Sequence, residues 1–220
     1  SDNAWFSFGV QGPMARSVQD VSLMLAAIAG PDQRVPLSIT ESGDQFMNPL
    51  DIDLRGKRIA FAPTLGGLPV CPAVVKVIEN QRNVFSDLGC ELVDICLDFG
   101  RADDVFRTLR AFRFAMKFGG LVGQHRQQMK ETVLWNIAEG EKLSGGDIGN
   151  AQRWRTELFN RAIEFFDEFD FLVGPVTQVA AFNIEEQFVS EIDGIQFTSY
   201  IDWMKSCYLA TATGMPAISV

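Results

Sequence analysis

The chain has 220 residues, of which 47% are hydrophobic and 11% aromatic, so it is long enough to form a sizeable packed core. Its formal net charge of −9 leaves no broad basic surface, which argues against a nucleic acid or an anionic membrane as partner. The apolar runs are far shorter than the ~20 residues of a membrane-spanning helix, and the first residues resemble neither a secretory nor a transit signal. We therefore expect a protein of the cytoplasm that is not inserted in a membrane.

The first half of the chain predicts a βαβ unit that follows an N-terminal helix. Ser17 can cap a helix that continues to Ile28 and stops at Gly30-Pro31, and a long surface crossing follows over residues 32–55. The βαβ unit consists of a buried strand, a helix and a second strand, over residues 57–62, 72–88 and 91–95. Such a unit implies local parallel pairing with a right-handed crossover.

The second half is predicted to be mostly helical. Helices are expected over residues 102–118, 128–141 and 147–168, with a glycine-rich break at 119–123. A core strand over 169–173 ends at Gly174-Pro175, and a helical pattern covers 200–212. Between them, Asp193-Gly194 joins two short strands in a predicted hairpin, since Asp-Gly readily adopts the positive φ angles of a type I′ turn. The last residues, 217–220, are typical of a strand, and a chain that ends inside a strand suggests truncation.

Polar residues that carry chemistry in other proteins have structural interpretations here. The one histidine, His125, lies in a polar stretch and is expected on an exposed helix face, and Ser144 is expected to cap a helix. The row of Arg107, Arg110 and Arg113 indicates one solvated helix face, and adjacent acids such as Asp103-Asp104 indicate charged surface. The four cysteines lack metal-ligand spacing and are expected as reduced thiols. We expect neither a metal nor a cofactor.

Four segments resemble the amidase signature family of amide hydrolases, in the order in which the family carries them. The segments begin at Gly12 (GPMARSVQD), Leu54 (LRGKRIA), Phe169 (FDFLVGPVT) and Thr213 (TGMPAISV), and together they span nearly the whole chain. The resemblance implies a serine nucleophile, a second serine in a cis peptide, a lysine and an oxyanion site of backbone amides. In the family these groups precede the segment that begins here at Gly12. The resemblance therefore implies that this chain holds no catalytic residue and is inactive alone.

The resemblance also indicates which residues face the substrate. In the family, the variable middle and the segment before the last strand line the cleft, which makes five residues candidates for its wall: Trp135, Thr177, Trp203, Cys207 and Tyr208. Ordinary core packing of the aromatic side chains is the alternative. The implied substrate is a small or medium amide, with aryl or linear apolar amides favoured by the aromatic lining.

The prediction is thus an α/β protein with a partial amidase-signature fold: a mixed sheet with a βαβ unit covered by helices, plus a β-hairpin. Residues 1–220 are expected to form a single domain that is a fragment of a larger one. Two alternatives remain: a non-catalytic interaction module that self-associates through exposed sheet edges or pairs with a missing half, and a small hydrolase that uses Ser144 or His125.

Overall fold

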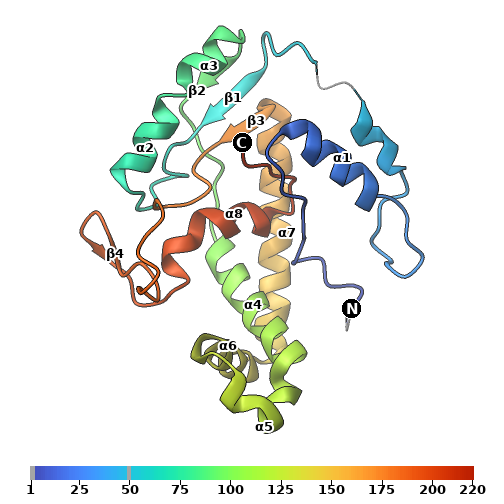
Figure 1. Ribbon diagram of the computed structural model, residues 1–220, viewed down its shortest axis with the longest axis vertical. Coiled ribbons are helices and arrows are strands. Elements are labelled where there is room, and N and C mark those ends of the chain that lie inside the picture. The colour runs from blue at the N-terminus through green and yellow to red at the C-terminus, as the bar shows by residue number, and fades with distance from the viewer. Residues whose placement is uncertain (1–2, 49–50) are drawn as a thin grey trace. The chain divides into compact units, whose positions relative to one another are not determined.

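The computed structural model describes residues 3–48 and 51–220 (Figure 1). The α-helices are α1 (Val18–Ile28), α2 (Pro72–Glu79), α3 (Arg82–Asp87), α4 (Ala102–Phe118), α5 (Val122–His125), α6 (Glu131–Glu141), α7 (Gly145–Glu168) and α8 (Lys205–Thr213). Short 3-10 helices are η1 (Gly43–Met47), η2 (Gly119–Leu121), η3 (Arg126–Gln128) and η4 (Asp202–Met204). The strands are β1 (Arg58–Phe61), β2 (Glu91–Val93), β3 (Phe171–Val173), β4 (Glu191–Ile192) and β5 (Ile195–Gln196). Among these helices, none is long and apolar enough to cross a membrane.

The chain divides into two compact units, which are described separately. The first unit comprises residues 1–53 and 218–220, and its main element is α1. The predicted cap is confirmed, because the Ser17 side chain accepts a hydrogen bond from the amide of Asp20. The following crossing contains η1, where a Cβ on Gly43 would lie 2.2 Å from the carbonyl oxygen of Ala26. Only glycine therefore permits η1 to approach α1 this closely.

The second unit, residues 54–217, holds a three-stranded parallel sheet in the order β2-β1-β3. The predicted βαβ unit is confirmed, because β1 pairs in parallel with β2 and α2 and α3 connect them. The central strand β1 is the most buried, since Ile59, Ala60 and Phe61 are each at most 2% exposed. The hairpin is also confirmed: β4 and β5 pair antiparallel, and both Asp193 and Gly194 have positive φ angles. The α/β class is thus confirmed, with antiparallel pairing in a separate hairpin.

The helices of the second unit are arranged around α4, which packs against α6, α7 and α8 (Figure 1). The contact between α4 and α6 is especially close at Gly140, where a Cβ would lie 2.2 Å from the carbonyl oxygen of Ala111. Because nearly every face of α4 is covered, this helix contributes five buried residues to the core: Ala102, Val105, Phe106, Leu109 and Ala111. The polar side chains of α4 must therefore find partners on neighbouring elements.

Several predicted boundaries were wrong. The helix expected over 72–88 is two helices, because the amide of Gln81 bonds to the carbonyl of Ile78 and tightens the chain into a turn. The helix expected from 147 begins at Gly145, since Ser144 and Asp147 form a capping box. Residues 217–220 form no strand; no described strand pairs with them, and a strand without a ladder leaves its backbone groups unbonded.

Candidate functional site

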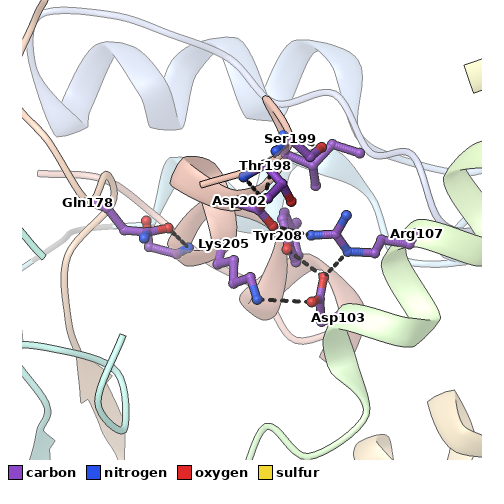
Figure 2. Close-up of polar contacts among 10 residues, drawn as sticks. Asp103, Arg107, Gln178, Thr198, Ser199, Asp202, Lys205 and Tyr208 are labelled. Atoms are coloured by element: carbon purple, nitrogen blue, oxygen red, sulfur yellow. Dashed lines mark hydrogen bonds and ion pairs between the residues drawn. The ribbon is translucent and has the colours of Figure 1, made fainter. Parts of the chain in front are cut away.

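One cluster of polar side chains joins α4 to α8, and we call it the Asp103 cluster: Asp103, Arg107, Asp202, Lys205 and Tyr208 (Figure 2). Asp103 Oδ1 accepts hydrogen bonds from the Tyr208 hydroxyl and from Arg107 Nε, both at 2.7 Å. Lys205 Nζ lies 3.0 Å from Asp103 Oδ2. Arg107 also reaches η4, where its Nη2 lies 2.5 Å from Asp202 Oδ1. Two carboxylates and two cations therefore balance one another inside the cluster.

Burial and hydrogen bonding have opposite effects on the pKa of the Asp103 carboxyl. Burial raises the pKa of Asp103, but the hydrogen bonds from Tyr208, Lys205 and Arg107 outweigh burial and leave the pKa below its ordinary value. Burial and the neighbouring Asp103 carboxylate raise the pKa of the Tyr208 phenol, whose ring stacks on Phe106 with centroids 3.9 Å apart. The stable state at neutral pH is thus an ionised Asp103 beside a protonated Tyr208.

A buried glutamine extends these contacts to the loop that follows β3. The Gln178 side chain accepts a hydrogen bond from the amide of Ser206 and donates one to the carbonyl of Pro69. The Ser206 hydroxyl and the Cys207 thiol both donate to the carbonyl of Val176. The first turn of α8 is therefore fixed against the loop of residues 174–179 on one side and against α4 on the other.

A second cluster lies about one helical turn further along α4, and we call it the Arg110 cluster: Arg110, Asn136, Tyr200 and Trp135. Arg110 Nε donates to Asn136 Oδ1 at 3.2 Å, and its Nη2 donates to the Tyr200 hydroxyl at 2.9 Å. Asn136, which is 2% exposed, donates to the Tyr200 hydroxyl and to the carbonyl of Thr132, both at 2.6 Å. The guanidinium lies 4.8 Å from the centre of the Phe114 ring. Every one of these partners is uncharged.

These clusters correct two interpretations made from the sequence. The row of Arg107, Arg110 and Arg113 is not a solvated face, since all three side chains are half-buried. Asp103 is not charged surface either, because it lies between α4 and α8, whereas the neighbouring Asp104 is exposed. The error has a physical cause: the sequence does not reveal that α6, α7 and α8 cover most of α4.

The five residues predicted for the cleft wall lie in two places. Three of them lie near the start of α8: Thr177, Trp203 and Cys207. The Cys207 thiol donates to the carbonyl of Val176, which precedes Thr177 in the loop after β3. The Thr177 hydroxyl donates within this loop, to the carbonyl of Val179. Trp203 contacts Phe182 edge to face at 5.3 Å, and its Nε1 is a buried atom without a partner among the described residues. Trp135 is 41% exposed and contacts Tyr200 edge to face at 6.0 Å.

Tyr208 differs from the other four, because it is 2% exposed and its hydroxyl is bonded to Asp103. Its packing matches the alternative of a core aromatic, while its role in a cleft wall stays a prediction. The sequence did not identify the remaining members of the two clusters: Asp103, Arg107, Asp202, Lys205, Arg110, Asn136 and Tyr200. A local signal existed for one pair alone, since Asp103 and Arg107 are four residues apart on a helix.

Two serine hydroxyls of the described residues lie beside a carboxylate, Ser42 beside Asp44 and Ser144 beside Asp147. Both are helix caps, since Ser42 accepts from the amide of Asp44 at the start of η1. The Ser144 hydroxyl is used in the capping box, and His125 is exposed. Burial raises the pKa of the Cys207 thiol, which disfavours the reactive thiolate. Among the described residues, no three His, Cys, Asp or Glu side chains lie close enough together to hold a metal ion. What the geometry does supply is a set of fixed aromatic and cationic side chains, which can contact a ligand.

Comparison with known proteins gives one consistent family. The family model described as Amidase matches residues 4–220. An acylamidase from Rhodococcus erythropolis is 27% identical over 98% of this chain and 46% of its own length. An amidase from Pseudomonas putida is 23% identical over 95% of this chain and 45% of its own length. The chain thus spans somewhat less than half the length of the curated relatives that it matches.

The fold agrees with this assignment. The solved structure of a bacterial aryl acylamidase of the amidase signature enzymes has a TM-score of 0.80 to this chain at 24% identity, and the match covers 96% of this chain and 46% of the aryl acylamidase. The resemblance noted in four sequence segments is therefore confirmed over the whole length of the chain. This chain belongs to the amidase signature family.

Proposed function

We propose that this chain supplies scaffold and one wall of the substrate cleft of an amidase, and that the groups that attack the amide lie outside it. One observation carries this proposal: 98% of the chain aligns with an acylamidase of which it covers 46%. In this account the five wall residues contact the substrate. The Asp103 cluster holds the two elements that carry three of them, η4 with Trp203 and α8 with Cys207 and Tyr208.

The proposed substrate is a small or medium amide with an aryl or linear apolar group. Two edge-to-face aromatic pairs, Phe182–Trp203 and Trp135–Tyr200, would offer apolar surface to such a group. The names of two relatives, an acylamidase and an aryl acylamidase, favour the same class. We also propose that residues 1–220 form part of one larger domain and that the protein resides in the cytoplasm, to which its four free cysteines are suited.

The first test uses the chain alone with a fluorophosphonate probe and an anilide substrate. We expect neither covalent labelling nor release of the aniline, because both need an activated serine. Labelling of one serine, lost when that serine is replaced by alanine, would overturn the proposal. Ser144→Ala and His125→Ala serve as matched controls for the alternative of a small hydrolase, which predicts that one of them abolishes activity.

A second test concerns the reading frame upstream of this chain. The proposal expects a lysine and a Gly/Ser-rich stretch with two serines there. If both are missing, the alternative of a free-standing interaction module is favoured. That alternative has its own support, since β2 and β3 each pair on one side within the described sheet, and Phe171 on β3 is 46% exposed. Sedimentation of the concentrated chain as a monomer would contradict it.

A further inference from the structure

The Arg110 cluster has more hydrogen-bond donors than acceptors. A guanidinium carries five N–H donors, and Arg110 uses one from Nε toward Asn136 and one from Nη2 toward Tyr200. Both N–H groups of Asn136 are used, by the carbonyl of Thr132 and by the Tyr200 hydroxyl. The Tyr200 oxygen accepts two hydrogen bonds, and none of the described residues accepts its own proton. Arg110 and Tyr200 therefore retain donors with no acceptor in the part of the chain that the structure describes.

The positive charge of Arg110 is also unbalanced. No carboxylate of the described residues pairs with Arg110, whereas the nearby Arg107 has two, Asp103 and Asp202. The aromatic face of Phe114 attracts the cation but does not neutralise it. A half-buried cation without a counter-ion is unfavourable unless a ligand or water completes its shell.

One of the unused donor groups, Arg110 Nη1, reaches solvent. Among the described residues, the buried side-chain nitrogen and oxygen atoms without a partner include Trp203 Nε1 but no atom of Arg110. Because Arg110 Nη1 has no hydrogen bond within the structure, it must reach the surface. The adjacent Trp135 is 41% exposed and offers an apolar face beside these donors. A ligand with a negative charge next to an apolar group matches this combination.

We propose that Arg110 and the Tyr200 hydroxyl bind a carboxylate, with Trp135 contacting the apolar group that carries it. The planar fork of a guanidinium suits the two oxygens of a carboxylate, and a tyrosine hydroxyl adds a third donor. Under the proposed function the carboxylate has two sources. It is either an acid group on the amide substrate or the acid that amide hydrolysis releases. This choice of source rests on the proposed amide hydrolysis, whereas the anion site itself rests on the donors.

The test measures ligand binding to the 220-residue chain by titration calorimetry at low salt. The probes are benzoate, 4-acetamidobenzoate, the neutral benzamide and inorganic phosphate. We expect both carboxylates to bind, and Arg110→Gln to weaken their binding about tenfold or more, because the variant loses the charged hydrogen bonds to the carboxylate. Benzamide should bind no better to the wild type than to the variant. The tighter of the two carboxylates identifies the source.

Three variants keep the result interpretable. Arg126→Gln removes the same charge from an exposed position and should leave the affinities unchanged. Arg110→Lys keeps the charge but loses the fork, and Tyr200→Phe removes the hydroxyl, so both should weaken binding by less than Arg110→Gln. Far-UV circular dichroism establishes which variants are folded, and if Arg110→Gln is unfolded, Arg110→Lys decides in its place.

Two results would overturn the site. One is the absence of carboxylate binding to the wild type. The other is an affinity that is equal in the wild type and in the folded Arg110 variants. Phosphate binding as tight as that of the carboxylates, and dependent on Arg110, would overturn the assignment to a carboxylate. None of these outcomes depends on amide hydrolysis, so a failure of the proposed function, such as labelling of a serine in the chain alone, is distinguishable from a failure of this site.

Discussion

Arg107 and Arg110 lie three residues apart on α4, yet their surroundings differ. Arg107 contacts two carboxylates, one on its own helix and one on η4, and its charge is balanced. Arg110 contacts an amide, a phenol and aromatic faces, all of them neutral. Arginine at successive turns of one helix thus serves two purposes. The Asp103 cluster fixes α8 to α4. The Arg110 cluster retains an unbalanced positive charge and unused hydrogen-bond donors, which are available to a ligand.

The comparison also separates two ways of stabilising a half-buried cation. A carboxylate partner strengthens the contact but becomes costly once the pair is broken, because the remaining charge has no counter-ion. Neutral partners contribute less to the free energy of unfolding, and less of it is lost when the cation is removed. We therefore expect substitutions in the Asp103 cluster to change stability and those at Arg110 to change binding.

The largest expected effect on stability comes from Gly140→Ala. This change disturbs the Arg110 cluster, which has residues on α6, and leaves the residues of the Asp103 cluster in place. The added Cβ would clash with the carbonyl of Ala111 and push α6, with Asn136 and Trp135, away from α4. Overpacking against backbone costs about 3 kcal/mol, which urea unfolding followed by circular dichroism measures. Carboxylate binding should be lost as well, because Asn136 no longer orients Arg110 and Tyr200.

Gly149→Ala is the matched control for this clash. Gly149 lies in α7, and a Cβ there would meet nothing within 4 Å. This variant should gain about 0.5–1 kcal/mol, because alanine favours a helix over glycine. Equal stabilities of the two variants would contradict the close contact of α4 and α6.

The next effect is that of Asp103→Asn, which removes the negative charge that Arg107 and Lys205 share and replaces one of the two carboxylate oxygens with an NH2 donor. We expect a loss of about 2 kcal/mol in the free energy of unfolding, less than for a fully buried pair because the Asp103 side chain is 35% exposed. Asp104→Asn is the control, since Asp104 pairs with Arg101 at the surface and its side chain is 52% exposed. An equal loss of unfolding free energy in both variants would show that the Asp103 cluster stabilises the fold no more than a surface ion pair does.

Local signals predicted much of the fold. The caps at Ser17 and Ser144 and the Asp193-Gly194 turn depend on side chains within a few residues, so the sequence contains them in full. The parallel pairing of β1 with β2 followed from a βαβ pattern. The break between α2 and α3 was not predicted. It depends on a hydrogen bond from one residue to the third before it, and neither a proline nor a glycine marks it in the sequence.

The two clusters were beyond prediction for a different reason. Arg107 and Asp202 are 95 residues apart in the sequence, and Arg110 and Tyr200 are 90 apart. No local spacing connects such residues, and a charged residue on a helix indicates solvent unless the covering elements are known. The resemblance to a family led to Trp135, Trp203 and Cys207, but it could not reveal which polar residues hold them in place.

A direct comparison of the two arginines gives a smaller effect. Arg107→Gln should lower the free energy of unfolding by about 1.5 kcal/mol, because Asp103 and Asp202 lose a shared cation in a partly buried place. Arg110→Gln should lower it by about 0.5 kcal/mol, because its partners are neutral and glutamine can still donate to them. Urea unfolding of both variants provides the test. The reverse order would contradict the distinction between the clusters.

The smallest effect concerns acid, and it isolates the charge of Asp103. The folded pKa of Asp103 lies below its unfolded value of about 3.9, so the stability that its ionisation contributes is present above about pH 4 and is lost as the pH falls through the folded pKa. Other carboxylates with lowered pKa values, such as Asp147 and Asp170, act equally in the wild type and in Asp103→Asn. The difference between the two stability curves therefore belongs to Asp103. Unfolding free energies measured from pH 7 to pH 3 should converge below pH 4, whereas parallel curves would mean that Asp103 ionises as freely in the folded chain as in the unfolded one.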